Sequence, residues 1–111
     1  MERERKAEVT RQTQETGVTI RLHLEGSGEH KISTGVPFLD HMLSQVAVHG
    51  LIDMSIVAQG DVHVDDHHTV EDVGIVLGQA LRQALGDGRG LTRYGSATIP
   101  MDDALVLVAL D

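Results

Sequence analysis

The sequence lacks several residue types on which other classes of protein depend. It has no cysteine and no tryptophan, and only one phenylalanine, one tyrosine and two prolines in 111 residues. Without cysteine, the chain has neither disulfides nor thiolate metal sites. One small domain with so few aromatic rings must build its core from Val, Ile, Leu, Ala and Met. Association of chains would add the burial that such a core lacks.

Basic residues and long apolar runs are also scarce. Nine Lys and Arg stand against 17 Asp and Glu, which gives a formal net charge of −8. Nucleic-acid backbones and anionic membranes are bound by basic faces, so neither is an expected partner. No apolar run approaches the ~20 residues that span a bilayer. Residues 1–6 (MERERK) carry no apolar signal segment, so we expect a cytoplasmic protein.

Alternation of apolar and polar residues predicts an α+β fold with several strands. We place strands at residues 7–13, 17–24, 31–34, 54–58 and 104–110. The last of these is strongly apolar and would promote aggregation unless it pairs within the sheet or is exchanged between chains. Residues 13–23 and 100–110 share an acidic position followed by a strand, which would fit a tandem repeat.

Two helices are predicted between these strands. Pro37 suits the first turn of a helix that ends near His49, because its missing N–H would have no partner there. Gly50 is the expected stop of this helix. A second helix should begin near Asp65 or Asp66, either of which can cap it. The apolar faces expected to be buried are Leu39, Met42, Leu43 and Val46, then Val70, Val73, Leu77, Ala80, Leu81 and Ala84.

Residues 61–72 form the most informative segment, because eight of these twelve residues are Asp, Glu or His. On a helix, Glu71 lies four residues after His67 and three after His68, so one turn presents all three. Two imidazoles and a carboxylate suit a divalent transition metal. Adjacent helical positions point ~100° apart, so the two histidines could serve two metals. A helix start with exposed polar residues is the alternative.

One helical turn rarely completes a metal site, so other ligands must come from elsewhere. His41 and His49 are the nearest candidates, and Asp40 could orient a ligating His41. A surface histidine explains His41 equally well. Arg93 follows a glycine-rich loop and could bind a phosphate group. An exposed loop arginine without a ligand is the simpler interpretation. Glu15 has no signal of its own. A zinc hydrolase is disfavoured because the order is not His-Glu-x-x-His.

Seven motifs follow one another along nearly the whole chain. They are TGVPFLDHMLSQ (34–45), HG (49–50), GD (60–61), DHHTVEDVG (66–74), LG (85–86), RYG (93–95) and PMD (100–102). Taken in order, they resemble the imidazoleglycerol-phosphate dehydratase family of histidine biosynthesis. Members of that family are carbon–oxygen lyases that convert imidazole glycerol phosphate to imidazole acetol phosphate by loss of water.

The resemblance implies a fold, a cofactor and a set of site residues. The family is built from two tandem β-β-α-β-α repeats, each a mixed sheet with two helices on one face. It uses a pair of Mn²⁺ ions per complete site and forms homo-oligomers with active sites between subunits. Implied metal ligands are His41, His67, His68 and Glu71. Implied substrate contacts are Glu15, His41, His49, His67 and Glu71, with Arg93 on the phosphate. Implied catalytic residues are Glu15 and Glu71.

The implied chemistry explains why a metal is needed. The proton to be removed lies on an unactivated carbon beside the imidazole ring of the substrate. A metal on a ring nitrogen can stabilise the imidazolate that results. Glu15 is then a candidate proton shuttle, while a second acid assists the loss of hydroxide. The residues alone do not assign which carboxylate performs which step.

The chain departs from the family in one respect. Residues 1–95 correspond to a first repeat, and residues 96–111 only to the opening strand or strands of a second. The second His-His-x-x-Glu helix is absent, so the chain is either a fragment or a half that pairs with copies of itself. We expect weak or no dehydratase activity from the isolated chain. The alternative function is a non-catalytic, self-assembling, metal-binding half-domain.

Overall fold

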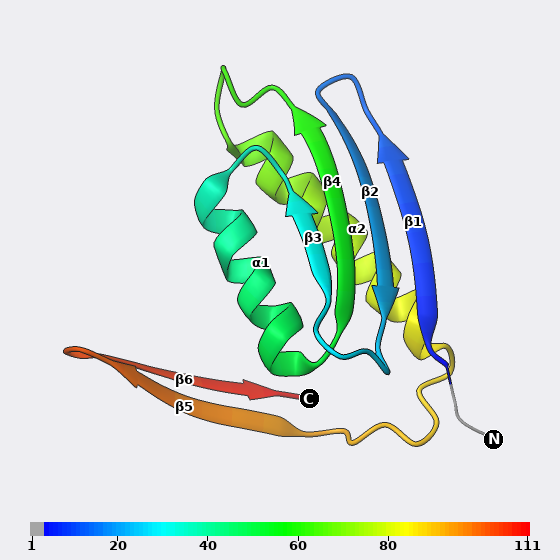
Figure 1. Ribbon diagram of the computed structural model, residues 1–111, viewed down its shortest axis with the longest axis vertical. Helices are drawn as coiled ribbons and strands as arrows, with labels where there is room; N and C mark the ends of the chain where they lie inside the picture. Colours follow the sequence, from blue (N-terminus) through cyan, green and yellow to red (C-terminus); the bar gives the residue numbers. More distant parts are fainter. Residues whose placement is uncertain (1–3) are drawn as a thin grey trace.

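The computed structural model describes residues 4–111 and confirms the α+β fold (Figure 1). Every predicted strand and helix is present, with ends that lie within two residues of the predicted ones. In chain order the elements are β1 (Lys6–Gln12), β2 (Thr16–His23), β3 (His30–Ser33), α1 (Pro37–Gly50), β4 (Asp53–Gly60), α2 (His67–Leu85), β5 (Gly95–Met101) and β6 (Ala104–Leu110).

The first four strands form one mixed sheet in the order β1-β2-β4-β3. β2 pairs antiparallel with β1 and β4, whereas β3 runs parallel to β4. Because side chains alternate along a strand, one face of the sheet carries the apolar residues. Both helices pack on that face, and one core cluster joins residues from the sheet and both helices: Val18, Ile20, Leu22, Met54, Ile56, Leu43, Ala47, Val73, Val76 and Ala80 among them.

The buried faces of both helices differ from the predicted ones: that of α1 is narrower, and that of α2 is rotated. In α1, Leu43 and Ala47 are buried, while Met42 and Val46 are 40% and 49% exposed. In α2, Val76 is buried and Val70 is exposed. The sheet covers only one side of each helix, so the remaining apolar positions have no cover within this chain. An apolar stripe therefore overestimates how much of each helix a single sheet can bury.

The ends of the helices also differ from the prediction. Asp66 precedes α2 with helical dihedral angles and makes no side-chain cap. The Oδ1 atom of Asp65 instead accepts the N–H of Asp66 at 2.6 Å. At the end of α1, Leu51 rather than Gly50 adopts the left-handed conformation, with φ of 55°. The two predicted capping signals were therefore wrong in detail, although both helices lie where the sequence placed them.

β5 and β6 form a separate two-stranded antiparallel sheet that extends away from the body of the protein (Figure 1). β6 pairs with β5 of its own chain along its whole length, from Met101↔Ala104 to Gly95↔Leu110. Of the two alternatives that the sequence left for this strand, the structure shows pairing within its own chain. β2 and β6 are each the second strand of an antiparallel hairpin, as a tandem repeat predicts. The division at residues 95 and 96 stays a prediction.

Asp53, at the start of β4, anchors the loop between β2 and β3. Its Oδ1 atom accepts the backbone N–H groups of Ser27, Gly28 and Glu29 at 3.0, 3.2 and 2.9 Å. Hydrogen bonds to an ionised carboxylate favour its charged form. The N–H of Ser27, followed by those of Glu29 and Gly28, therefore lowers the pKa of Asp53 from its ordinary value of 3.8.

Asp53→Asn is expected to lower the urea midpoint of unfolding at pH 7. The pKa of Asp53 is lower in the folded protein, so its stabilising effect is present above pH 3.8 and is lost as the pH falls through the folded pKa. The difference in urea midpoint between Asp53→Asn and the parent should therefore become smaller in acid. Asp103→Asn, in the exposed β5–β6 turn, is the control. Equal midpoints for Asp53→Asn and the parent at pH 7 would contradict this prediction.

Candidate metal centre

His67, His68 and Glu71 lie together in the first turns of α2, on the helix predicted for them. The two imidazole rings are close neighbours, with centroids 4.1 Å apart and planes tilted by 46°. The segment between β4 and α2 returns directly to this helix start, which brings Asp61 and Asp65 beside the histidines. The local spacing therefore gathers two imidazoles and three carboxylates at one end of the sheet.

Asp61 orients the ring of His68. The Oδ2 atom of Asp61 lies 2.8 Å from Nδ1 of His68, and the Asp61 side chain is only 18% exposed. This hydrogen bond raises the pKa of His68 and lowers that of Asp61, and the charges of Glu15 and Glu71 raise the pKa of His68 further. With Nδ1 engaged, Nε2 is the nitrogen left for another partner. Histidines that bind metals commonly have this carboxylate support.

His67 also has a carboxylate beside its ring, but at a longer distance than His68. Its Nδ1 atom lies 3.5 Å from Oδ2 of Asp65, and both side chains are exposed. The donor chemistry of the two histidines and Glu71 thus fits Mn²⁺. Among residues 4–111, however, no three such side chains converge closely enough to hold a metal ion. One chain supplies oriented donors without completing a site.

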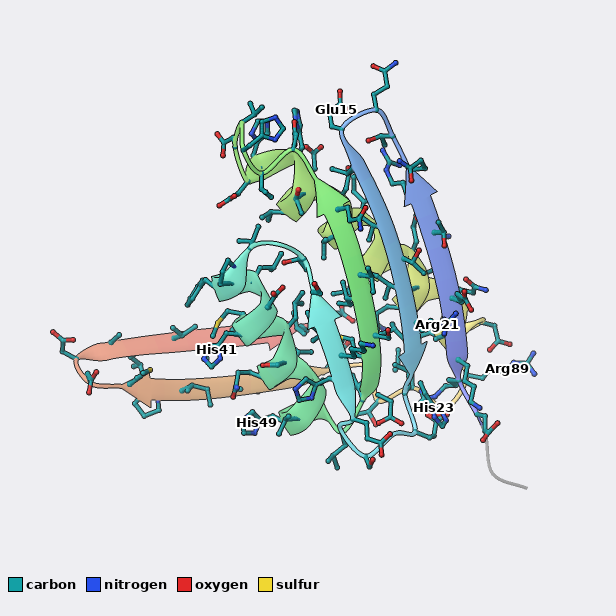
Figure 2. The ribbon with its side chains drawn as sticks, turned by 45° about the horizontal axis from the view of Figure 1, so that its top comes forward. Glu15, Arg21, His23, His41, His49 and Arg89 are labelled. Carbon is teal, nitrogen blue, oxygen red and sulfur yellow. The ribbon has the colours of Figure 1, made fainter. Side chains whose placement is uncertain are left out.

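The other predicted ligands lie elsewhere. Figure 2 shows His41 and His49 projecting from α1, whereas Glu15 lies at the tip of the β1–β2 turn. α1 packs beside β3, at the edge of the sheet opposite β1. Nε2 of His49 is 3.1 Å from Oε1 of Gln45. The structure thus brings Glu15 into the electrostatic range of His68 but does not bring the α1 histidines to the α2 donors of the same chain.

Asp40 does not support His41 as the sequence suggested. Its Oδ1 atom instead accepts the backbone N–H of Thr34 at 2.9 Å, together with the Thr34 hydroxyl. This carboxylate therefore fastens the loop before α1 to the helix. The prediction of Asp40 as an outer partner of His41 was wrong, because the buried Thr34 offers it two donors.

Arg93 is exposed and forms a two-point ion pair with the side chain of Asp111. The distances are 2.6 Å from Nε to Oδ1 and 3.2 Å from Nη2 to Oδ2. The guanidinium also lies over the ring of Tyr94, 5.1 Å from its centroid. A phosphate bound by Arg93 would take the place of the Asp111 carboxylate, since both offer the same pair of oxygens.

A hollow of about 730 Å³ lies at the other end of the sheet from the α2 donors, and its lining includes Arg21 and His23. Figure 2 shows both side chains near one end of β2. Each has an acidic neighbour, with Glu8 3.3 Å from Arg21 and Asp53 3.8 Å from His23. None of the predicted site residues lines this hollow, so we assign the candidate site to the α2 donors.

Asp61 was not recognised from the sequence as a partner of His68. Asp61 lies seven positions before His68 and outside α2, which begins at His67, so helical periodicity does not relate the two. Asp61→Asn is expected to weaken Mn²⁺ binding roughly 10- to 100-fold, the usual cost of removing a carboxylate behind a ligating histidine. Isothermal titration calorimetry measures this, with Asp103→Asn as the matched control. Equal affinities in the two variants would refute the role of Asp61.

These features define a class of protein: an α+β domain whose helix α2 begins with carboxylate-supported histidines, a donor set that suits a divalent metal ion. Comparison with known sequences narrows the class. The sequence profile of the imidazoleglycerol-phosphate dehydratase family matches residues 34–111. The dehydratase of Hahella chejuensis is 63% identical over 108 residues, and that of Dechloromonas aromatica 61% identical over 107. The chain belongs to the imidazoleglycerol-phosphate dehydratase family, whose members are carbon–oxygen lyases.

Solved structures of the family confirm the fold. The Staphylococcus aureus dehydratase superimposes with a TM-score of 0.78 and 36% identity, covering 94% of this chain and 56% of its own. The Pyrococcus furiosus enzyme, solved with the ligand (S)-C348, superimposes with a TM-score of 0.76 and 42% identity. The match covers 91% of this chain and 52% of that enzyme. The Hahella and Dechloromonas alignments cover 97% and 96% of this chain and 55% of each relative. The chain therefore spans about half the length of its relatives. Neither helix in residues 4–111 has the length and apolar character needed to cross a bilayer.

Proposed function

We propose that this chain supplies half of a manganese-dependent dehydratase site, which converts imidazole glycerol phosphate to imidazole acetol phosphate in histidine biosynthesis in the cytoplasm. One observation carries the proposal: in a member of this family, Asp61 holds His68 with one ring nitrogen free, within the electrostatic range of Glu15 and Glu71. This end of the sheet combines nitrogen donors with carboxylates, which suits both metal binding and proton transfer.

Each proposed residue has a defined part in this reaction. His67, His68 and Glu71 hold the metal, together with His41 of a second copy or a histidine from the other half of the complete protein. Bound Mn²⁺ supplies Lewis-acid stabilisation of negative charge on the substrate. Glu15 carries the proton removed from the carbon beside the imidazole ring. Glu71 is the second catalytic residue, in addition to its role as a metal ligand. His49 contacts the substrate, and Arg93 binds its phosphate.

Assembly of several chains is part of the proposal. α1 leaves Phe38, Met42 and Val46 exposed, and the β5–β6 hairpin leaves Leu105 and Leu107 exposed. Exposed apolar area of this kind favours association. A homo-oligomer would cover these faces and would bring the α1 histidines of one copy near the α2 donors of another. The site would then lie between subunits.

A non-catalytic, self-assembling, metal-binding half-domain is the second candidate. It is favoured by the half-length match to the relatives. This candidate shares the metal and the assembly with the first. It differs from the first in binding Mn²⁺ without turning over the substrate.

Metal content and oligomer size, measured on the same Mn²⁺-loaded sample, test both candidates. The proposed shared site predicts about two tightly held Mn²⁺ per chain in a large assembly, by elemental analysis and multi-angle light scattering. His41→Ala should then lower the metal content although His41 lies far from the α2 donors in its own chain. A small oligomer without metal would refute both the shared site and the metal-binding half-domain.

A further inference from the structure

Asp72 is the one charged side chain that is buried among residues 4–111, with 8% of its surface exposed. It follows Glu71 directly but lies on the inner side of α2. Its Oδ2 atom accepts the hydroxyl proton of Thr16, and its Oδ1 atom lies 3.7 Å from Nε of Arg11. The Asp72 carboxylate is therefore directed at the β1–β2 hairpin rather than at the metal donors.

A chain of hydroxyl groups connects Asp72 to the Glu15 turn. A threonine hydroxyl has one proton, and that of Thr16 is donated to Asp72. In the 3.1 Å contact between the hydroxyls of Thr13 and Thr16, the proton must therefore come from Thr13, whose hydroxyl also lies 3.4 Å from Oε2 of Glu15 and 3.5 Å from the carbonyl oxygen of Thr16. The oxygen of Thr13 accepts the backbone N–H groups of Glu15 at 3.2 Å and of Thr16 at 3.0 Å. Hydrogen bonds thus run without a break from α2 to the backbone of Glu15.

Close packing limits how far the two elements can shift against each other. Gly60 pairs with Thr16 across β2 and β4. A Cβ atom at Gly60 would clash with the Thr69 hydroxyl and would lie 3.1 Å from Cγ2 of Thr16. Thr69 is fully buried in the first turn of α2. The start of the helix thus rests directly on the ends of β2 and β4, which leaves the Asp72 contact as the polar connection across this packing.

We propose that Asp72 is a positioning residue, which acts through Thr16 and Thr13 to hold the Glu15 turn against the helical turn of His68 and Glu71. The inference rests on the proposed role of Glu15 as proton carrier. Glu15 directly precedes Thr16, which pairs with Gly60 across β2 and β4, and Gly60 directly precedes Asp61, the partner of His68. A carboxylate that moves a proton must stay within hydrogen-bonding reach of its substrate, so a loose turn would lower its efficiency.

Two variants of Thr16 separate the hydrogen bond from the packing. Thr16→Val keeps the shape and removes the hydroxyl, while Thr16→Ser keeps the hydroxyl. Amide hydrogen exchange at Glu15 and Thr16 is expected to become on the order of tenfold faster in Thr16→Val, because a bond to a charged acceptor is lost. The exchange rates in Thr16→Ser should stay close to those of the parent. The rates in Asp72→Asn should fall between those of the parent and those of Thr16→Val. Exchange at Glu15 that is unchanged in both Thr16→Val and Asp72→Asn would overturn the proposal.

Ligand affinities distinguish positioning from a general loss of structure. In Thr16→Val the affinity for Mn²⁺ should stay within about twofold, since no metal donor is touched, while the affinity of the Mn²⁺-loaded chain for imidazole glycerol phosphate falls. Adding Thr16→Val to Glu15→Gln should cause no further loss of affinity for imidazole glycerol phosphate. A parallel loss of Mn²⁺ affinity, with faster exchange throughout α2, would show a structural role only. If Glu15→Gln leaves substrate affinity unchanged, the proposed role of Glu15 fails, while the exchange data still decide whether Asp72 holds the turn.

Discussion

The isolated 111-residue chain is expected to dehydrate imidazole glycerol phosphate at least about 100-fold more slowly than a full-length relative. The reason is geometric. Glu15, His68 and Glu71 lie at one end of the sheet, whereas His41 and His49 belong to α1 at the far edge. Without a second set of donors held in place, Lewis-acid stabilisation of the transition state is incomplete. The measurement is kcat/KM for purified protein loaded with Mn²⁺.

The Staphylococcus aureus dehydratase, prepared and assayed in the same way, is the reference for this comparison. Circular dichroism and light scattering on the same sample establish that the shorter chain is folded and give its assembly state. Turnover near the rate of the reference enzyme would contradict the prediction. It would also mean that copies of this chain complete one another's sites for catalysis and not only for metal binding.

His68→Ala is expected to weaken Mn²⁺ binding by at least about 100-fold, more than the loss of its supporting carboxylate. His68 has the best-oriented ring of the candidate site, because the 2.8 Å contact with Asp61 fixes its Nδ1 and leaves Nε2 for the metal. The variant removes that nitrogen and also leaves Asp61 without its partner. Calorimetry or the electron paramagnetic resonance signal of free Mn²⁺ gives the affinity.

His30→Ala is the matched histidine control for this measurement. His30 lies in β3, and its Nδ1 atom contacts the backbone oxygen of Gly28 at 3.0 Å, so it belongs to the loop that Asp53 anchors. Its removal should leave Mn²⁺ affinity within about twofold of the parent, since it contributes no proposed ligand. If His68→Ala and His30→Ala bind Mn²⁺ equally well, His68 is not a ligand.

Local patterns were sufficient for most elements of this fold, although β5 was not among the predicted strands. In β2, the alternation of Val18, Ile20 and Leu22 both predicts the strand and selects the face that is buried. Pro37 marks the first turn of α1 because its missing N–H costs nothing there. Of the two predicted caps of α2, Asp66 makes none, and Asp65 is shared between the N–H of Asp66 and the ring of His67. Such competition among adjacent polar residues does not follow from spacing.

The sequence by itself determined that His67, His68 and Glu71 share one helical turn, because the period of an α-helix is a local property. Only the tertiary structure decided which groups meet that turn. Asp72 and Thr16 are 56 residues apart in sequence, and the bond between them exists because α2 packs across the ends of β2 and β4. The same packing places α1 beside β3, which separates His41 from the α2 donors. Long-range contacts depend on how the elements pack, and no local pattern encodes that arrangement.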